Sequence, residues 1–568
     1  MKKKIVLINP PRYEPMPLHT LQDLPYGLLK IGGYHLEQGH DVTLINCLSR
    51  TIDLREKIRD IKCGNYENEG IVRPVFRYGM GPEEIEEKLR EIENPDEIWI
   101  TSTMTYYWEC VHEVIDIAKK VYPNCPVFLG GIYASICRDN AQNSKADYIH
   151  YGPYLPAENS RTALELLEQI PDYFIIKYSR GCPHNCSYCA VSKLEGHKMT
   201  FMDNEAFVSE LEEKYHIFGI KNFSLWESNL LVDAKNKFEK VLDEIIARKL
   251  PIGLKFPEGL QPSLIYPELA IKMKKAGVKN FSLPLESSDE SMYDRFHKPS
   301  SLKQFDRAVR IFKDVGFKPH QIKTFVLVGM PNQTIESIVL SDFKAMAMQT
   351  FLLNLKFTPI PGTEEYEKNK DKLKDKSLGD LHPNAYPFAH PGMTVKDLEI
   401  IGKLNKSTNL YMLVTLRDSK PKEAFKKLIK QHLVNIDDAS SKECADIQIL
   451  NTTNTKEDKD IYKLLNTIRN IKSQGKYYAV YKPLPKCKLK DRKSRAEFKE
   501  LPSSCKKCLL LFTEGCKFHE LKSITDEDIK DSYDIYKKDI KKKCLACIHY
   551  RRGNCRMLCA QIKENENR

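Results

Sequence analysis

The 568-residue sequence lacks long apolar runs, internal low-complexity tracts and an evident secretory leader. No charge-poor apolar stretch reaches about 18 residues, so we expect no membrane span. The N-terminal MKKKIVLINPPRY has a basic start but only a short apolar stretch, which predicts a first β-strand rather than a signal peptide. We therefore expect the protein in the cytoplasm.

The composition favours metal or redox chemistry over disulfides, because 17 cysteines stand in a chain expected to be cytoplasmic. The length predicts roughly three or four domains, and a hydrophobic share of 41% suffices for their cores. The formal net charge of +12 raises the question of nucleic-acid binding. The lysines are spread widely, however, which is typical of solvated helix faces, so nucleic acid is not an expected partner.

One loop carries a recognisable set of metal ligands. The segment SRGCPHNCSYCA at 179–190 places Cys182, Cys186 and Cys189 in a C-x-x-x-C-x-x-C triplet. Three thiolates so spaced can ligate three irons of a 4Fe–4S cube and leave the fourth iron open to a small molecule. From spacing alone, a zinc site completed by His184 is the alternative.

Residues 1–155 alternate short apolar strands with helical patterns. We expect strands at 5–8, 41–46, 97–101 and 126–131, and helices at 26–38, 82–92 and 108–120. This alternation predicts an α/β domain with a doubly wound, Rossmann-like parallel sheet and ligands at the carboxyl ends of its strands. The candidate turns there are 9–11, 101–104 and Gly130-Gly131; the two glycines would admit a ligand or serve only a tight turn.

Residues 170–370 repeat the alternation more regularly. Strands are expected at 173–179, 221–226, 252–256, 278–285, 323–328 and 353–357. Helices are expected between them, near 203–217, 233–248, 266–276, 302–315 and 335–348. Six such units predict a partial (β/α)6 TIM-like barrel, in which the chemistry lies at the carboxyl ends of the strands. The cysteine triplet directly follows the first of these strands.

The C-terminal third has a different pattern. Residues 371–480 are lysine-rich and mostly helical, and 481–568 form a cysteine-rich region. Its candidate metal ligands are Cys487, Cys505, Cys508, Cys516, Cys544, Cys547, Cys555 and Cys559. Eight thiolates suit two 4Fe–4S clusters or two zinc ions. The remaining cysteines lack ligand spacing and are expected to be buried: Cys47, Cys63, Cys110, Cys125, Cys137 and Cys444.

Taken in order, the barrel motifs resemble the radical S-adenosylmethionine (SAM) superfamily. FSLPLESSDE at 281–290 is similar to the family's fourth-strand Glu–Ser segment, LVGMPNQT at 327–334 to its Gly-x-Pro turn, and FTPIPGTEEYE at 357–367 to its Pro-Gly-Thr ending. With these motifs present, zinc at the triplet is no longer expected.

The resemblance implies specific SAM contacts. Tyr188, just before the third cysteine, would pack near the adenine, as would Gly329 and Pro331. Glu286 and Ser287 would touch the ribose or aminoacyl group. It also implies reductive cleavage of SAM to a 5′-deoxyadenosyl radical, an external reductant such as flavodoxin or ferredoxin, and oxygen sensitivity.

The N-terminal region is similar to the cobalamin-binding domain of one branch of this superfamily, through stretches at 7–13, 24–46, 101–105 and 128–135. The resemblance implies cobalamin contacts from Tyr26, Gly27, Ser102, Thr103, Gly130 and Gly131. No D-x-H-x-x-G motif is present, so no histidine is offered as a lower axial ligand, and some domains of this type bind nothing.

The tail is similar to auxiliary-cluster domains of the SPASM type, although the middle gap of CLACIHYRRGNCRMLC has seven residues instead of five. We therefore expect a radical SAM enzyme that uses cobalamin to methylate an unactivated carbon of a small molecule or peptide. One alternative is radical oxidation, cyclisation or carbon–sulfur bond formation with auxiliary clusters. Another is a non-catalytic iron–sulfur or zinc protein that binds nucleic acid, which the ordered barrel motifs disfavour. Tyr106, Tyr107 and Trp108 would wall a substrate cavity or simply pack the following helix.

Overall fold

The computed structural model describes residues 2–15, 24–48, 56–64, 71–388 and 393–399, with a few positions beyond. The predicted helical extension after residue 399 and the cysteine-rich region at 481–568 lie outside them, apart from residues 401, 402, 405, 409, 433–435 and 477–479. The eight C-terminal candidate ligands and Cys444 therefore stay predictions. None of the described helices is long and apolar enough to cross a membrane.

The chain divides into two compact units. The first comprises Met1–Thr334 and Leu353–Val395, so the predicted boundary between residues 155 and 170 falls inside it. The second comprises Ile335–Leu352 and Lys396–Arg568. In the second unit, helix α12 (Ile335–Ala347) is joined to the following segment by a hydrogen bond from Asn405 Nδ2 to Asp342 Oδ2 of 2.8 Å. Its strands β17 (Leu433–Asn435) and β18 (Tyr477–Ala479) pair antiparallel.

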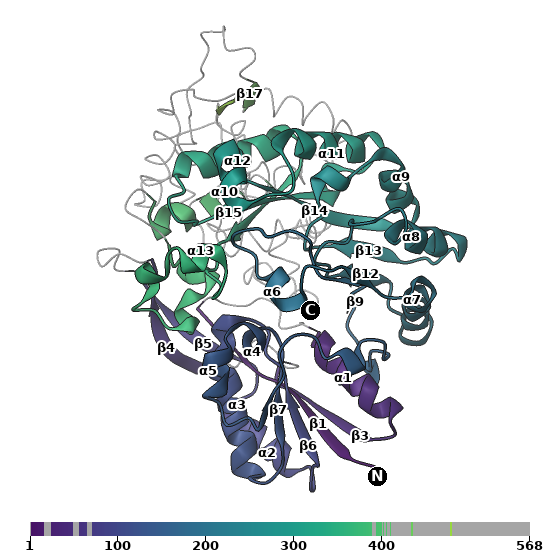
Figure 1. Ribbon diagram of the computed structural model, residues 1–568, viewed down its shortest axis with the longest axis vertical. Coiled ribbons are helices and arrows are strands. Elements are labelled where there is room, and N and C mark those ends of the chain that lie inside the picture. The colour runs from purple at the N-terminus through teal and green to yellow at the C-terminus, as the bar shows by residue number, and fades with distance from the viewer. Residues whose placement is uncertain are drawn as a thin grey trace, which may run out of the picture. The chain divides into compact units, whose positions relative to one another are not determined.

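A five-stranded parallel sheet forms the N-terminal part of the first unit (Figure 1). Its order is β3-β1-β6-β7-β8: Asp41–Asn46, Lys4–Asn9, Glu97–Ile100, Val127–Leu129 and Tyr148–Ile149. Its helices are α1 (Tyr26–Glu37), α2 (Pro82–Arg90), α3 (Trp108–Val121), α4 (Ile132–Ile136) and α5 (Arg138–Gln142). The predicted doubly wound sheet is confirmed, and its order reverses between β1 and β6, where ligands bind in such sheets.

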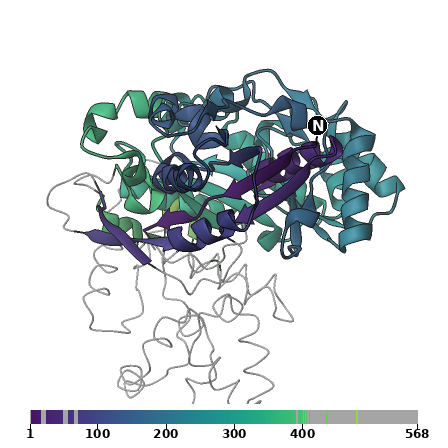
Figure 2. The ribbon, with the colours of Figure 1, turned by 90° about the horizontal axis from the view of Figure 1, so that it is seen from below.

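Burial explains why these segments form the sheet. Five of the six residues of β1 are buried, as expected for a central parallel strand covered on both faces. Trp99 on β6 stacks on Phe128 of β7 with ring centroids 4.5 Å apart, and Phe128 stacks in turn on Tyr148 at 4.7 Å. Figure 2 shows the strands of this sheet, in purple and dark blue, running side by side.

The sequence analysis missed a three-stranded antiparallel sheet. It consists of β2 (Arg12–Glu14), β5 (Val72–Tyr78) and β4 (Glu56–Lys62), in that order. Five of the seven residues of β4 are charged and its two isoleucines are three positions apart, so the segment has no apolar run that predicts a strand. Its neighbour β5 supplies Arg77, whose buried guanidinium donates to Glu113 of α3 at 2.6 and 2.7 Å.

The second sheet of the first unit is the partial barrel. Its six strands follow chain order: β9 (Tyr173–Ile176), β12 (Asn222–Leu225), β13 (Gly253–Phe256), β14 (Val278–Glu286), β15 (Ile322–Val328) and β16 (Phe351–Lys356). The connecting helices are α7 (Asn204–Phe218), α8 (Phe238–Ala247), α9 (Pro267–Lys275) and α11 (Leu302–Asp314). The predicted strands and helices are thus confirmed to within a few residues.

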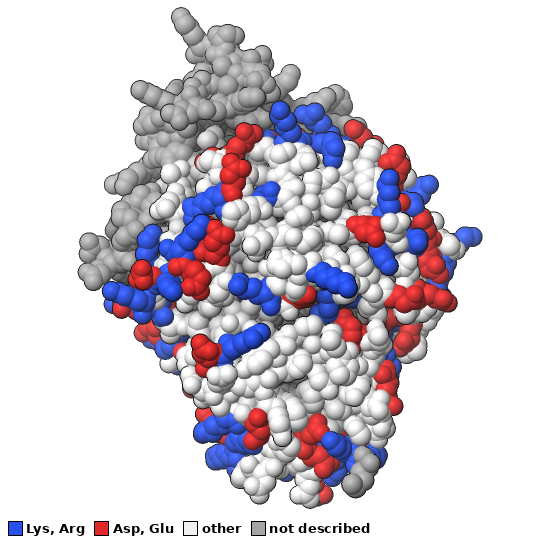
Figure 3. All heavy atoms as spheres, in the orientation of Figure 1, with Lys and Arg blue, Asp and Glu red and all other residues white. Residues whose placement is uncertain are grey.

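Aromatic packing fixes which face of this sheet meets the helices. Phe281 of β14 lies against Phe312 of α11, with ring centroids 4.1 Å apart, and against Phe317 at 5.2 Å. Residues that alternate with Phe281 therefore point to the opposite, inner face. On the outside, lysine, arginine and acidic side chains are interspersed across the face in Figure 3, as expected for solvated helices.

Two glycines of α1 give a matched test of packing. A Cβ on Gly33 would lie 1.9 Å from the Arg161 carbonyl oxygen, whereas one on Gly27 meets nothing within 4 Å. Gly33→Ala should therefore lower the free energy of unfolding by about 1–3 kcal/mol. Gly27→Ala should leave it unchanged or raise it by up to about 1 kcal/mol, because alanine favours the helix. Urea unfolding measures both, and equal stability of the two variants would contradict this packing.

Candidate active site

The cysteine loop (residues 181–190) leaves the barrel at the carboxyl end of β9. The buried carboxylate of Glu227, just beyond β12, accepts hydrogen bonds from the backbone N–H groups of Tyr178 (2.6 Å) and Ser179 (2.9 Å). The loop begins at Gly181, whose φ of 89° suits glycine, and a Cβ there would lie 2.3 Å from the Lys198 carbonyl oxygen. The start of the loop is therefore held by the neighbouring strand end.

Backbone hydrogen bonds hold the rest of the cysteine loop. Cys182 N donates to the Gly196 carbonyl at 3.1 Å, and Cys189 N donates to that of Cys186 at 3.0 Å. Ser187 is clamped from both sides, because its N–H donates to Phe296 O at 3.1 Å and its carbonyl accepts from Glu365 N at 2.9 Å. These hydrogen bonds give the cysteine loop a defined path.

The three cysteines of the predicted triplet lie half-buried in this loop. Burial raises the pKa of the Cys186 thiol, against the opposing charge of Lys298, and raises the pKa of Cys189 to about 11. The charge of Cys182 raises the pKa of Cys186 further, and the charges of Cys186 and Cys182 do the same for Cys189. Metal loading would release their protons.

His184 does not complete a zinc site with the three cysteines in the part of the chain that the structure describes. Among the described residues, no three His, Cys, Asp or Glu side chains converge closely enough to hold one metal ion. His184, the proposed fourth zinc ligand, has its Nε2 2.9 Å from Gln261 Oε1. The Cys182 sulfur instead accepts from Asn229 Nδ2 at 3.7 Å. Among the described residues, no fourth side chain joins the three thiols as a metal ligand.

Glu286 occupies the end of β14, where the sequence places a SAM contact. Its Oε1 accepts from Tyr188 Oη at 2.9 Å and from Lys298 Nζ at 3.0 Å, and Lys298 also lies 3.0 Å from Tyr188 Oη. Burial disfavours the charged form of Lys298, but the negative charges of Glu286 and Cys186 outweigh it and raise its pKa. Glu286 and Lys298 therefore form a buried ion pair beside the cysteine loop.

One oxygen of this carboxylate has no partner. Glu286 Oε2 is buried and accepts no hydrogen bond from any described residue. Leaving such an acceptor unpaired costs about 1–3 kcal/mol or more, so it invites a donor from a ligand. A ribose hydroxyl or an amino group meets this need, and SAM carries both. The residues present therefore fit SAM.

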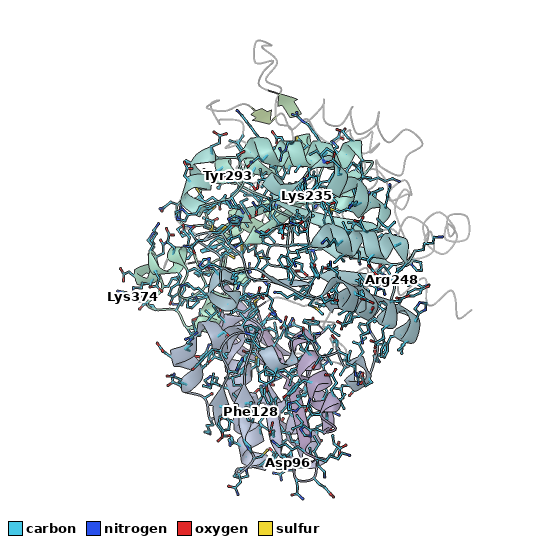
Figure 4. The ribbon with its side chains drawn as sticks, turned by 45° about the vertical axis from the view of Figure 1, so that its right-hand side comes forward. Asp96, Phe128, Lys235, Arg248, Tyr293 and Lys374 are labelled. Carbon is cyan, nitrogen blue, oxygen red and sulfur yellow. The ribbon has the colours of Figure 1, made fainter. Side chains whose placement is uncertain are left out.

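The backbone aims this carboxylate. Glu286 has φ 62°, a left-handed conformation that is uncommon outside glycine, at a register shift between β14 and β15. The adjacent Leu285 carbonyl accepts from the hydroxyl of Tyr293 on α10 (Glu290–Phe296) at 2.5 Å. Figure 4 labels Tyr293 on the ribbon with its side chains. Ser287, fully buried, accepts from Asp289 N at 3.1 Å and so orders the turn.

The Gly-x-Pro turn after β15 is built around Gln333. Its Oε1 accepts from Gly329 N (2.9 Å) and Met330 N (3.2 Å), and its Nε2 donates to Leu327 O at 2.7 Å. Gly329 has φ 84°, which suits glycine. The Pro331 carbonyl accepts from Arg295 Nη1 at 2.7 Å, which ties this turn to α10.

Sequence reasoning missed the ion pair that joins these parts. Arg295 donates Nε to Glu365 Oε1 (2.9 Å) and Nη2 to Glu365 Oε2 (2.6 Å), and the Glu365 side chain is fully buried. Glu365 stands in helix α13 (Glu364–Glu367), directly after the Pro-Gly-Thr ending. An acidic residue in a first helical turn is unremarkable in sequence, so nothing local indicates its burial or its partner. Lys298 was also missed, because nothing in the neighbouring sequence indicates that it is buried or that Glu286 is its partner.

The predicted ligand-facing turns of the N-terminal sheet do meet at one edge. Asn9, which ends β1, donates its Nδ2 to Asn46 Oδ1 of β3 at 2.8 Å. Ser102 follows β6 and donates its Oγ to the Gly130 carbonyl after β7 at 2.6 Å. Gly131 has φ 100°, and a Cβ there would lie 2.1 Å from the Ser102 carbonyl oxygen. The close backbone contact alone thus accounts for Gly131.

The other residues predicted to contact cobalamin differ in burial. Tyr26 at the start of α1 makes an edge contact with Phe174 of the barrel at 6.5 Å, Gly27 is exposed, and Thr103 is half-buried. Tyr107 is buried and hydrogen-bonded to Glu14, so for this residue the packing interpretation holds. The cysteines expected to be buried are so: Cys47, Cys63, Cys110, Cys125 and Cys137.

Part of the chain matches a family model. A model described as the radical SAM superfamily matches residues 176–341. The chain is 24% identical over 391 residues to an anaerobic magnesium-protoporphyrin IX monomethyl ester cyclase of Cereibacter sphaeroides, covering 58% of this chain and 62% of that protein. It is 23% identical over 261 residues to an uncharacterized methyltransferase of Pyrococcus horikoshii, covering 45% and 54%. The chain thus spans less than two thirds of these relatives.

Among solved structures, the fold is similar to that of the radical S-adenosylmethionine methyltransferase TsrM of Kitasatospora setae, solved with cobalamin and a [4Fe-4S] cluster. The TM-score is 0.51 at 14% identity, over 76% of this chain and all of that one. This likeness covers the parallel-sheet architecture described above.

The Arg295–Glu365 pair gives a test of the site's framework. Arg295→Met leaves the fully buried Glu365 carboxylate without its bidentate partner, so the free energy of unfolding should fall by about 3–5 kcal/mol. Arg310→Met, at an exposed position of α11, should change it by no more than about 0.5 kcal/mol. Denaturant unfolding under anaerobic conditions compares them. Equal losses would show that the pair does not stabilise the fold.

Proposed function

We propose that this protein, whose residues 176–341 match a model of the radical SAM superfamily, cleaves SAM reductively and uses cobalamin to methylate an unactivated carbon of its substrate. The observation that carries the proposal is the juxtaposition of an open set of three thiols with the unpartnered Oε2 of Glu286 at one end of the barrel. The thiols suit a cluster with one open iron. The carboxylate suits the polar groups of a nucleoside bound beside it.

Each side chain then has a role that its contacts support. Cys182, Cys186 and Cys189 hold the cluster, and Glu286 Oε2 accepts a hydrogen bond from SAM. Lys298 forms an ion pair with Glu286 and, together with Tyr188, donates to its other oxygen, Oε1. When bound, the cluster and SAM supply a 5′-deoxyadenosyl radical, and cobalamin supplies the methyl group. The chain's own task is to orient these groups and exclude water.

The N-terminal sheet supports the cobalamin part of the proposal. Its strand order reverses between β1 and β6, where a doubly wound sheet takes its ligand. Two apolar side chains are exposed at the carboxyl edge, Met104 (44%) after β6 and Ile132 (37%) after β7, and they suit a broad apolar macrocycle. The sequence contains no D-x-H-x-x-G motif, so the histidine of that motif would not take part in holding cobalamin.

The repeated C-x-x-C segments of the C-terminal region favour a second candidate. Auxiliary clusters there would accept an electron from a substrate radical and so allow oxidation, cyclisation or carbon–sulfur bond formation. The substrate in either case is a small molecule or peptide, and a flavodoxin or ferredoxin is the proposed reductant. Cytoplasmic location and oxygen sensitivity also remain predictions.

Iron content tests the cluster assignment. Anaerobic reconstitution should yield about four irons for the cysteine loop and about twelve with two auxiliary clusters. Cys186→Ala should lose about four of these irons and all SAM cleavage to 5′-deoxyadenosine in the presence of dithionite. Cys110→Ala, which removes a buried thiol without ligand spacing, should keep both. A wild-type protein that holds iron but never forms 5′-deoxyadenosine would overturn the enzymatic proposal.

Cobalamin binding has a separate spectroscopic test. Protein purified after growth with hydroxocobalamin should show corrin absorbance that survives removal of the iron. Ile132→Lys should reduce the retained cobalamin severalfold, because the macrocycle would cover a charged group that water otherwise solvates. Ile271→Lys is the control, since Ile271 is similarly exposed (42%) but lies on α9 of the barrel. No corrin in the wild-type protein would favour the second candidate.

A further inference from the structure

Two lysines share the inner face of the barrel sheet. In the strand register, Lys255 of β13 lies beside Ser224 of β12 and Asn280 of β14. Ser282 of β14 lies beside Lys323 of β15. Residues paired across strands, and residues two apart along a strand, point to the same face of a sheet. Lys255, Asn280, Ser282 and Lys323 therefore all share one face.

That face is the inner one. Phe281, between Asn280 and Ser282, packs on Phe312 of the outer helix α11. Its two neighbours consequently point away from the helices. Trp226, just beyond β12, donates Nε1 to Ser224 Oγ at 3.2 Å, so it borders the same face and is 41% exposed. Lys255 and Lys323 are half-buried, so part of each side chain meets solvent.

The donors on this face lack acceptors. Among the described residues, no carboxylate forms an ion pair with Lys255 or Lys323. The hydroxyl of Ser282, between the two lysines in the register, is fully buried and has no hydrogen-bond partner among the described residues. Burial lowers the pKa of Lys323, and the charge of Lys255 lowers it further. Lys255, Lys323 and the Ser282 hydroxyl thus offer three hydrogen-bond donors on one face of the sheet, and no described acceptor pairs with them.

We propose that Lys255, Lys323 and Ser282 bind an anionic group, a carboxylate or a phosphate, carried by the substrate. The inference rests on the proposed function, since it names the substrate class for the same barrel. Ser282 stands four residues before Glu286 on β14, which corresponds to roughly 13 Å along the strand. The anionic group therefore lies remote from the reacting carbon and anchors the substrate from the far end.

A different explanation of the lysines is that their long side chains merely reach water at the barrel end. That explanation leaves the buried Ser282 hydroxyl unpartnered and gives no reason for two unpaired cations on adjoining parts of one inner face. An anion satisfies all three groups together. An anionic group that contacts two or three of these donors at once is also held in one orientation, which suits anchoring of a substrate.

Anion binding to the reconstituted full-length protein tests the site, with inorganic phosphate and propionate as probes in separate calorimetric titrations. We expect saturable binding of at least one probe, and the tighter one identifies the group that the substrate carries. Lys255→Met and Lys323→Met should each weaken it at least tenfold, whereas Lys240→Met, at an exposed position of α8, should not. Lys323→Arg keeps the charge and should restore most of the affinity.

Iron content and melting temperature identify variants that fail to fold. If Lys323→Met fails to fold, the affinity of Lys323→Arg still tests the contribution of the charge at this position. Absence of saturable binding, or equal binding in wild type and both methionine variants, would overturn the anion site. Substrate-independent SAM cleavage should be unaffected by phosphate and by either substitution. Inhibition by phosphate would assign the anion to the SAM site and likewise overturn the proposal. Absence of SAM cleavage in the wild type would instead refute the proposed function, and the calorimetric titration would still show whether the anion site exists.

Discussion

The buried carboxylate of Glu365 is the interaction on which the arrangement of the active site depends. Its two oxygens are held by the Arg295 guanidinium, and its backbone N–H is bonded to the Ser187 carbonyl in the middle of the cysteine loop. Arg295 also binds the Pro331 carbonyl after β15. One ion pair therefore joins the loop, α10, the turn after β15 and the end of the barrel. Because a buried pair of this kind is costly to break, these contacts hold the four parts together.

A smaller ion pair depends on that framework. Lys298 follows α10, and its contact with Glu286 requires α10 to stay where Arg295 holds it. Glu286 in turn positions Tyr188 of the cysteine loop. The thiols and the carboxylate are consequently placed by the same set of contacts, which explains how a loop without regular structure can present three sulfur atoms and one oxygen atom in a reproducible arrangement.

The fold could be predicted from the sequence where the signal was local. Regular alternation of apolar runs and amphipathic segments located both parallel sheets, and spacing located the cysteine triplet. The antiparallel strands β4 and β5 escaped because charges interrupt them, as did Arg295, Glu365 and Lys298, whose partners lie between 12 and 70 residues away. Gly131 shows another limit, because a glycine required by the Ser102 backbone looks the same in sequence as one required by a ligand.

The left-handed backbone of Glu286 has a consequence for recognition. Holding a non-glycine residue in that conformation costs on the order of 1–3 kcal/mol, and the cost is incurred once, when the chain folds. The side chain is then already oriented when a ligand arrives, so binding spends little entropy on ordering it. Replacement by glycine would relax the backbone but remove the acceptor. The strained backbone of Glu286 therefore preorganises its carboxylate for ligand binding.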